Sequence, residues 1–402
     1  MYNTRFVNKD LLWIGASDHR LSLFENVYPI PQGISYNSYL LLDDKTVLFD
    51  TVDSSVRYQF FANLTHALNG RTLDYIVIQH MEPDHCAEIS AIVKLYPNIK
   101  IVCNLQTKKM IGQFFDLKIP DEQFLPVKEK DTLDTGNHKL IFIAAPMVHW
   151  PEVMMTYDAT AKILFTADAF GTFGALNGNI FADEIDFTKD YMDEARRYYT
   201  NIVGKYCPQV QAVLQKVALL EISTICPLHG FIWRQNLNLF MEKYQRWSTY
   251  TPEQKGVVIS YGSIYGNTYN AVSVLAANLA EKGIRNIQMF DVSVTHPSYI
   301  ISKMFEYSNL IFASSTYNAG IFVNMENLLN DLVAHNLQNR NIAIIDNGTW
   351  AATAGKQMKE KLLLLNNCSF IEPLISLKSS LSDNQLPDIE TLAQNIYATL
   401  KE

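Results

Sequence analysis

The sequence predicts two domains of different architecture, an α+β domain followed by an α/β domain with a doubly wound parallel sheet. A chain of 402 residues is too long for one hydrophobic core. From Gly256 onward, short apolar runs alternate five times with amphipathic stretches of helical period, which is typical of a parallel sheet covered by helices. The preceding part mixes alternating strand patterns with helices. We therefore expect domains at residues 1–250 and 251–402, with the boundary in the polar stretch WSTYTPEQKG.

In the first domain, strand and helix patterns follow one another without a regular alternation. The runs SYLLLDD (38–44), KTVLFDT (45–51) and KLIFIAAP (139–146) alternate apolar and polar residues and predict strands. The stretches SVRYQFFANLTHALNG (55–70) and HCAEISAIVKLY (85–96) have helical periodicity. Mixed sheets layered with helices are the expected architecture.

In the second domain, each strand pattern is followed by a helix pattern. The predicted strands are GVVISYGS (256–263), IRNIQMFDV (284–292), NLIFASSTYN (309–318), NIAIIDNGTW (341–350) and SFIEPLISL (369–377). The predicted helices are residues 268–283, 297–308, 324–336, 353–365 and 386–402.

Charge and cysteine content exclude several classes of function. The formal charge of −8 divides into −5 for residues 1–250 and −3 for the remainder, which argues against nucleic acid or an anionic membrane as the main partner. The five cysteines are scattered and form no CxxC pair, so neither a disulfide framework nor a cysteine-built metal site is expected. The N-terminus has no secretion signal and no stretch is apolar enough to span a bilayer, so we expect a cytoplasmic protein.

Histidines and carboxylates stand at the ends of apolar runs in the first domain. The segment HMEPDH follows the strand-like run DYIVIQ, and further donors end the runs before HWPE, DAFG and HGFIW. The donors are His80, Glu82, Asp84, His85, His149, Asp168 and His229. Six or seven nitrogen and oxygen donors without a thiolate suit two metal ions. Oxygen-rich sites of this kind favour iron that must bind a diatomic gas, and Asp168 has two oxygens with which to bridge two metals.

The alternative for each single histidine is an ordinary hydrogen-bonded residue. Seven donors that each end an apolar run are harder to explain in that way, because buried charges must be paired or bound to metal. The remaining histidines have no such setting, and we interpret them as surface or core residues: His19, His66, His138, His296 and His335.

A hydroxyl-rich loop opens the first helix of the second domain. ISYGSIYGNTYNAV places Ser263, Gly266, Asn267 and Thr268 where backbone N–H groups and the helix N-terminus favour a phosphate. The loop is neither GxxxxGK[ST] nor GxGxxG, so a mononucleotide is the better expectation. The ends of two later strands, SSTYNAG (314–320) and DNGTW (346–350), offer polar edges and aromatic faces for a flat ring.

In these motifs the chain resembles the flavodiiron proteins, the family that includes rubredoxin:oxygen oxidoreductases. The shared motifs, in the order of that family, are GISYNSYLL, His80-x-Glu82-x-Asp84-His85, HWPE, LFTADAFG, HGFIW and Ser263-x-x-Gly266-Asn267-Thr268. The resemblance implies a metallo-β-lactamase-like αββα sandwich followed by a flavodoxin-like domain that binds FMN. Hydrolytic relatives usually carry histidine where this chain has Glu82, so the resemblance implies a non-haem di-iron centre instead of a zinc pair.

Carried over by residue, the resemblance implies one iron held by His80, Glu82 and His149 and another by Asp84 and His229, with Asp168 bridging. His85 is expected to be turned away from the metals, and with Tyr199 it is a hydrogen-bond or proton donor. The expected flavin contacts are Ser263, Ile264, Tyr265, Gly266, Asn267, Thr268, Ser315, Thr316, Tyr317, Asn318, Gly320, Asn347, Gly348, Thr349 and Trp350. DNGTW departs from the usual Gly-Ser-Tyr-Gly-Trp type of stretch, and SSTYNAG lacks the usual proline.

The resemblance implies reduction of O2 to water, of NO to N2O, or both, at the di-iron site fed by FMN. It implies an external donor, usually rubredoxin with a deazaflavin cofactor as another, and a head-to-tail homodimer or homotetramer of the minimal two-domain class. One alternative is a zinc hydrolase of the metallo-β-lactamase superfamily fused to a flavodoxin-like module. Another is a non-enzymatic electron carrier whose first domain is only a scaffold.

Overall fold

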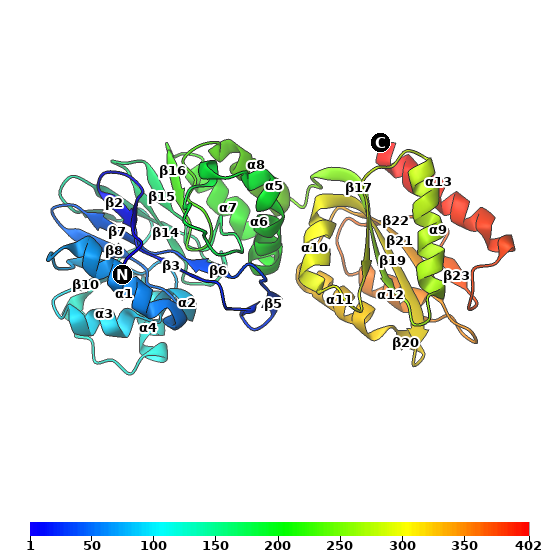
Figure 1. Cartoon of the computed structure of the whole chain (residues 1–402), viewed down its shortest axis with the longest axis horizontal. Coiled ribbons are helices and arrows are strands. Elements are labelled where there is room, and N and C mark those ends of the chain that lie inside the picture. The colour runs from blue at the N-terminus through cyan, green and yellow to red at the C-terminus, as the bar shows by residue number, and fades with distance from the viewer. Residues whose placement is uncertain (402) are drawn as a thin grey trace. The chain divides into compact units, whose positions relative to one another are not determined.

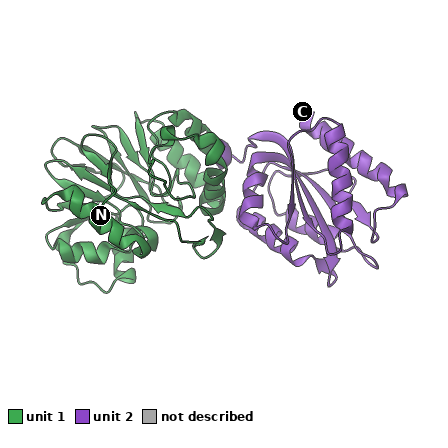
Figure 2. Cartoon of the chain, in the orientation of Figure 1, with its two compact units in different colours: residues 1–245 green, residues 246–402 purple. Residues whose placement is uncertain are grey.

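The computed structural model describes residues 1–401 and divides into two compact units, Met1–Gln245 and Arg246–Glu402 (Figure 2). The expected boundary, between residues 250 and 251, lies slightly farther along the chain. The connecting segment belongs with the second unit because a buried side chain of that unit holds it. The guanidinium of Arg340 donates a hydrogen bond of 2.6 Å to the backbone carbonyl of Tyr250 and further bonds to other carbonyls of the unit.

The first unit contains two β-sheets that lie between two layers of helices. The first sheet has the order β1 (Arg5–Phe6), β2 (Leu11–Trp13), β7 (Tyr39–Leu42), β8 (Thr46–Phe49), β9 (Tyr75–Val77), β10 (Lys100–Cys103) and β11 (Phe124–Pro126). The second has the order β12 (Thr132–Asp134), β13 (Lys139–Ala144), β14 (Met154–Asp158), β15 (Ile163–Phe165) and β16 (Thr224–Cys226). Two short pairs lie outside these sheets: β3 (Ala16–Asp18) with β6 (Ile34–Tyr36), and β4 (Leu23–Phe24) with β5 (Tyr28–Pro29).

Helices cover the outer side of each sheet (Figure 1). On one side lie α1 (Arg57–Leu68), α3 (Ile89–Leu95) and α4 (Leu105–Phe114); on the other lie α5 (Phe187–Asp190), α6 (Met192–Tyr198), α7 (Cys207–Val217) and α8 (Leu237–Ser248). This order of layers confirms the predicted αββα sandwich. The helix expected at residues 85–96 is shorter, because a separate helical turn, α2 (Pro83–Cys86), precedes α3 and begins on a proline.

Aromatic side chains join the two sheets of the first unit. Phe49 of the first sheet stacks on Phe165 of the second with ring centroids 4.0 Å apart, and Tyr39 meets Phe165 edge-on at 5.5 Å. All three side chains are buried. Such ring pairs contribute about 0.5–1.5 kcal/mol beyond the burial of their area, so they help to hold the two sheets together.

The second unit is a parallel sheet of the predicted doubly wound kind. Its central order is β18 (Ile287–Asp291), β17 (Gln254–Gly262), β19 (Tyr307–Tyr317), β21 (Asn341–Asn347) and β22 (Ser369–Phe370), with β20 (Gly320–Ile321) beside β19 and β23 (Ile375–Leu377) beside β21. The single strand expected at residues 369–377 is therefore two short strands. The strand order reverses between β17 and β19, which is where such folds bind ligands.

Helices lie on both faces of this sheet: α9 (Asn267–Glu281) and α13 (Leu386–Lys401) on one, and α10 (Pro297–Glu306), α11 (Val323–Ala334) and α12 (Ala354–Leu362) on the other (Figure 1). Val257 and Ile259 of β17, Leu275 of α9, and Ile389 and Leu392 of α13 pack in one apolar cluster and are fully buried. Each side chain of this size contributes about 1.5–3 kcal/mol by burial. The apolar periodicity of the helices thus predicts their packing faces correctly.

The sequence gives His138 no metal-binding role, and in the structure its imidazole ties the two sheets together. Its Nδ1 lies 2.6 Å from Asp158 of the second sheet and its Nε2 lies 3.2 Å from Asp10, just before β2 of the first. Burial alone would lower the pKa of His138. The hydrogen bond and charge of Asp158, followed by Asp10 and the nearby Asp43, outweigh burial and raise the pKa above its usual value.

Replacement of His138 by glutamine is expected to destabilise the first unit in a pH-dependent way. Because the folded pKa is raised, the stabilisation is complete below the unfolded value of about 6.5 and is lost as the pH rises through the folded pKa. We expect a loss of about 1.5–3 kcal/mol near pH 6 and a smaller loss near pH 9. Thermal unfolding at both pH values measures the difference, with the exposed His19→Gln as control. A difference that grows with pH would contradict this assignment.

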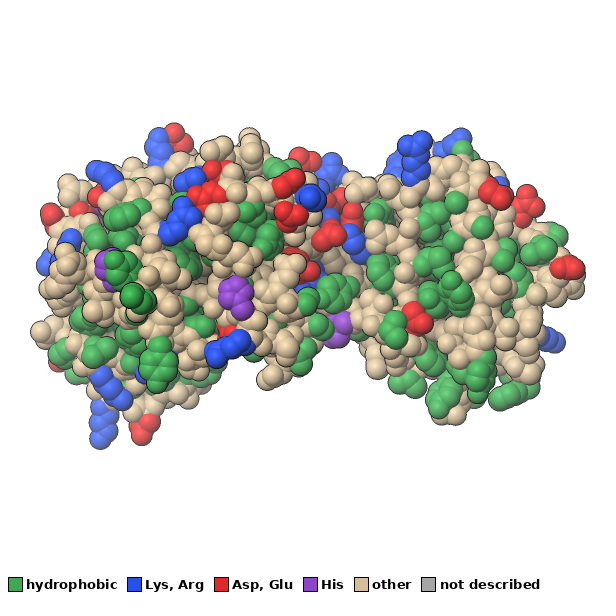
Figure 3. Space-filling view, viewed as in Figure 1, with side chains coloured by type: hydrophobic (Ala, Val, Ile, Leu, Met, Phe, Trp, Pro, Cys, Tyr) green, Lys and Arg blue, Asp and Glu red, His purple; other side chains and the backbone are tan. Residues whose placement is uncertain are grey.

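No helix within residues 1–401 has the length and apolar character needed to cross a bilayer. On the face drawn in Figure 3, lysine and arginine side chains are interspersed with aspartate and glutamate, without a large patch of one sign. On this face the distribution agrees with the small negative charge of both parts of the sequence.

Candidate functional site

The predicted donors come from the ends of strands in both sheets of the first unit. His80 follows β9, and Glu82, Asp84 and His85 stand at or within α2. In the second sheet, His149 lies between β13 and β14, Asp168 follows β15, and His229 follows β16. Strand ends on one edge of a sandwich face the same space, so residues that are up to 149 positions apart in sequence converge there.

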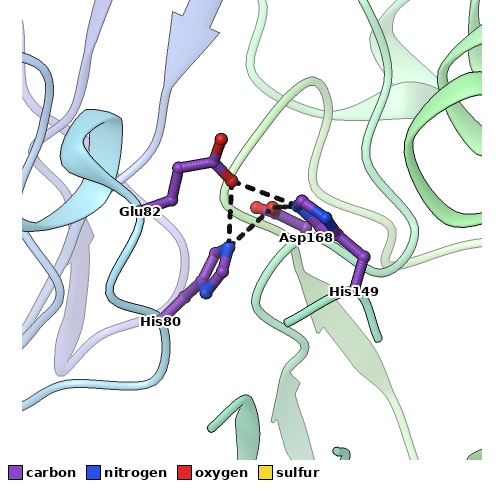
Figure 4. Close-up of side chains that lie close together, drawn as sticks. All are labelled: His80, Glu82, His149 and Asp168. Atoms are coloured by element: carbon purple, nitrogen blue, oxygen red, sulfur yellow. Dashed lines mark hydrogen bonds and ion pairs between the residues drawn. The ribbon is translucent and has the colours of Figure 1, made fainter. Parts of the chain in front are cut away.

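The first group of donors consists of His80, Glu82, His149 and Asp168 (Figure 4). Glu82 Oε2 lies 3.2 Å from His80 Nε2 and 3.1 Å from His149 Nε2. Asp168 Oδ2 lies 3.3 Å and 3.1 Å from the same two nitrogens. Two carboxylates and two imidazoles therefore direct four ligand atoms toward one point.

The second group consists of Asp84, His85 and His229. His85 Nε2 and His229 Nε2 are 3.0 Å apart, and Asp84 Oδ2 lies 3.4 Å from the first and 3.2 Å from the second. Asp168 turns its other oxygen to this group, because its Oδ1 lies 3.1 Å from His85 Nε2 and 3.8 Å from His229 Nε2. The two oxygens of Asp168 thus face different groups.

The chemistry of both groups fits divalent metal ions. Ligands about 2.1 Å from one ion and at right angles lie about 3 Å from each other, which matches the spacing of these atoms. Both oxygens of Asp84 and Oδ1 of Asp168 are buried and accept no hydrogen bond from residues 1–401. Buried carboxylate oxygens of this kind need a partner, and two cations would supply it.

The shifted pKa values of the donors show that their charges interact. Burial lowers the pKa of His149, but the hydrogen-bonded carboxylates of Asp168 and Glu82 outweigh it and raise the value to about 9. Burial raises the pKa of Glu82, but the hydrogen bonds from His149 and His80 and their positive charge hold it well below its usual range. Protons and metal ions therefore compete for the same atoms, and metal affinity should fall at low pH.

The loops that carry the donors are held by hydrogen bonds and by unusual backbone conformations. Asp50, a residue that the sequence did not single out, accepts hydrogen bonds from the backbone N–H of Gln79 at 2.8 Å and of His80 at 3.3 Å. Left-handed backbone occurs in Met147 near His149 and in Ala167 immediately before Asp168. Residues without glycine's freedom adopt such angles only where surrounding structure enforces them, and functional sites are common places for this.

The resemblance implies that His85 turns away from the metal site, but in the structure His85 points toward the other donors. Its Nε2 points among the donors of the second group, 3.1 Å from Asp168 Oδ1. The reason is local, because His85 stands on the single turn α2, one residue after Asp84, and this turn directs both side chains into the site. The structure therefore brings His85 together with the ligand set.

Tyr199 does not reach the site, and its neighbour Tyr198 does. The hydroxyl of Tyr199 lies 3.2 Å from Cys207 Sγ and its ring packs on Tyr244. The ring of Tyr198 lies 5.6 Å from that of His229, and its buried hydroxyl has no hydrogen-bond partner within the described chain. Burial and then the charge of Asp168 raise the pKa of Tyr198 well above its usual value. Successive helical residues point about 100° apart, so the sequence alone cannot choose between them.

A cavity of about 510 Å³ touches both groups of donors. Glu82 of the first group and Asp84 of the second lie in its wall, together with Leu21, Leu23 and Phe24. Glu25 also lines it as an exposed residue, and partial loss of water around its carboxyl, followed by the charge of Glu82, raises the pKa of Glu25. This segment has no donor pattern, so nothing in the sequence indicates that it belongs to the site.

The second unit has a separate cavity of about 410 Å³ at the ends of β17, β19 and β21. All of the expected flavin contacts line it except Gly266 and Gly320. Thr268 Oγ1 lies 2.9 Å from Ser315 Oγ, so the first and second loops meet. Asn347 donates to the carbonyl of Ser379 at 2.8 Å, which adds a loop after β23 that the sequence analysis missed.

These loops bring both polar groups and aromatic residues to the cavity. Gly266 precedes α9 with a left-handed φ of 89°, so the N-terminus of that helix opens toward the cavity. The rings of Trp350 and Tyr265 stand 94% and 92% exposed near its rim. A helix N-terminus suits a phosphate, and exposed rings suit the face of a flat heterocycle.

Comparison with known proteins shows which family the chain is similar to. The family described as ODP family beta lactamase matches residues 34–230. The anaerobic nitric oxide reductase flavorubredoxin of Vibrio vulnificus is 31% identical over 382 residues, which cover 94% of this chain and 75% of the relative. The rubredoxin oxygen:oxidoreductase of Desulfovibrio gigas superposes with a TM-score of 0.90 at 27% identity, covering 99% of this chain and 98% of that one. The flavodiiron protein of Giardia intestinalis has the same fold, with a TM-score of 0.92 at 23% identity over 100% and 98% of the two chains.

Proposed function

The chain belongs to the flavodiiron proteins, and on this premise we propose that it reduces O2 to water, NO to N2O, or both. It is an oxidoreductase that uses a flavin and non-haem iron. The zinc hydrolase alternative is not favoured by the relatives, which are named as reductases. In our proposal the flavin is FMN and the iron is a pair of ions in the first unit.

The observation that carries this proposal is the position of Asp168 between two groups of donors. His80, Glu82 and His149 would hold one ion, and Asp84, His229 and His85 the other. When bound, the two irons and the flavin supply the electrons and the open coordination positions that reduction of a small gas requires. The residues of the chain hold these groups, and the cavity beside Glu82 and Asp84 admits a molecule to both.

Turnover of the reduced protein with each gas in turn tests this function. The protein is reduced under anaerobic conditions, each gas is added in turn, and an electrode follows its concentration. We expect protein that holds two irons and one FMN per chain to consume O2, NO or both. Protein that contains zinc without iron, or flavin that cycles without consuming either gas, would contradict the proposal. The comparison of the two rates also decides which gas is preferred.

A tyrosine hydroxyl beside the donors is the proposed hydrogen-bond or proton donor to the substrate. Replacement of Tyr198 by phenylalanine is expected to lower turnover by about 100-fold at unchanged iron content, which is the usual effect of losing a positioned proton donor. Tyr199→Phe is the matched control, because that hydroxyl faces Cys207. Rate measurements with metal analysis on both variants decide the assignment, and a slow Tyr199→Phe beside an unaffected Tyr198→Phe would reverse it.

Electrons reach the flavin from a partner protein, which we propose is a rubredoxin. The two cofactor cavities lie in different units of the chain. We therefore propose a head-to-tail homodimer, alone or paired into a tetramer, in which the flavin of one chain serves the irons of another. Solution scattering of the loaded protein tests this assembly. A cytoplasmic location is part of the proposal, because no disulfide joins the cysteines within residues 1–401.

A further inference from the structure

Glu152, the last residue of the HWPE motif, contacts a donor residue on the opposite sheet. Its Oε1 lies 2.8 Å from His80 Nδ1 and accepts a hydrogen bond of 2.9 Å from the backbone N–H of Met81. The backbone carbonyl of Glu152 accepts a third bond, 2.6 Å long, from the side chain of Asn104. A residue of the connection between β13 and β14 thus holds the loop that follows β9.

The surroundings of Glu152 are unusual for a carboxylate with a purely structural role. The side chain is 1% exposed, and its Oε2 has no hydrogen-bond partner among residues 1–401. Within that part of the chain no lysine or arginine forms an ion pair with it, and its only ion-pair contact is His80. Because a buried charge is costly unless it is compensated, the positive charge that balances Glu152 must come through the imidazole.

The two histidines of the second group lack such a partner. His229 Nδ1 donates to the backbone carbonyl of Ser35 at 2.7 Å, which is a neutral acceptor. His85 Nδ1 is buried and has no hydrogen-bond partner in residues 1–401. Of these three imidazoles, His80 is therefore the one whose far nitrogen faces an anion.

We propose that Glu152 is a positioning residue for His80 and makes the two metal positions chemically unequal. As acceptor at Nδ1 it fixes the tautomer whose Nε2 lone pair faces the first group, and its charge makes that nitrogen a stronger donor. An ion in the first group would then be held more tightly than an ion in the second group, and its oxidised state would be favoured. The inference rests on the proposed iron pair and concerns a residue that does not itself bind the metal.

Two variants separate orientation from charge. Glu152→Ala removes both, and we expect one iron of the pair to be released to a chelator about 10- to 100-fold faster than from the unmodified protein. Glu152→Gln keeps an oxygen that accepts from Nδ1 and from Met81 but removes the charge. We expect this variant to retain both irons while the Mössbauer doublet of one iron shifts and that of the other does not.

Glu129→Gln is the matched control. Glu129 also accepts a backbone hydrogen bond beside β13, from the N–H of Ala144, and pairs with Lys216, but it touches no donor residue. The inference would be overturned if Glu152→Ala released both irons at the rate of the unmodified protein. It would also be overturned if both Mössbauer doublets of Glu152→Gln were unchanged or shifted equally. If Glu152→Ala does not fold, the Glu152→Gln spectrum decides alone. An unmodified protein that binds no iron would instead refute the proposed function.

Discussion

Replacement of Asp168 by alanine is expected to empty both metal positions and to lower turnover by far more than 100-fold. Loss of a residue that only orients a ligand already weakens metal binding by about 10- to 100-fold. Asp168 does more, because its Oδ2 lies 3.1 Å from His149 and its Oδ1 lies 3.1 Å from His85, each in a different group. Without it, the first group keeps Glu82 as its one carboxylate and the second group keeps Asp84, and nothing links the two groups. Iron analysis and gas consumption on the same preparation measure the effect.

The amide variant Asp168→Asn sharpens this test. Asparagine has nearly the same shape, but its nitrogen is a donor that cannot bind a cation, so only one side keeps a ligand oxygen. We expect at most one iron per chain. Asp158→Asn is the control, since Asp158 is also a buried, histidine-paired carboxylate of the second sheet but lies away from the donors. Two firmly bound irons in Asp168→Asn would show that Asp168 belongs to one position only.

The sequence predicts the donors well because their position depends on local structure. His80 and Asp168 each follow an apolar strand, and strand ends of a sandwich meet at one edge whatever the details of packing. The direction in which a side chain points cannot be predicted in this way. Tyr198 and Tyr199 are equivalent in the sequence, and only the tertiary packing, with Tyr199 on Tyr244 and Tyr198 beside His229, shows which one lies next to the donors.

Residues that support the site from outside the motifs were harder to predict. Glu25 and Ser379 reach their cavities through segments without a periodic pattern, so nothing in their neighbours indicates a role. Glu152 lies within the HWPE motif, but its contact with His80 depends on the packing of two sheets whose strands are far apart in sequence. Contacts of this kind follow from tertiary packing and have no local signal.

Replacement of Gly266 by valine is expected to weaken flavin retention while leaving iron content unchanged. Gly266 has a φ of 89°, and a β-branched residue is strained there by about 1–3 kcal/mol even though no described atom within 4 Å blocks its Cβ. We expect the loop to relieve this strain by turning its N–H groups away from the cavity, and each 1.4 kcal/mol lost would weaken flavin binding tenfold. We therefore expect a loss of about 10- to 100-fold in affinity.

Gly283 provides a control within the same unit. It stands just beyond the other end of α9 with a φ of 87°, and a Cβ there also meets no described atom within 4 Å. Gly283→Val therefore introduces a similar backbone strain far from Thr268 and the cavity. We expect both variants to unfold at a lower temperature but only Gly266→Val to lose FMN on gel filtration. If the two variants lose FMN equally, the effect is one of general stability, and the loop before α9 does not bind the phosphate.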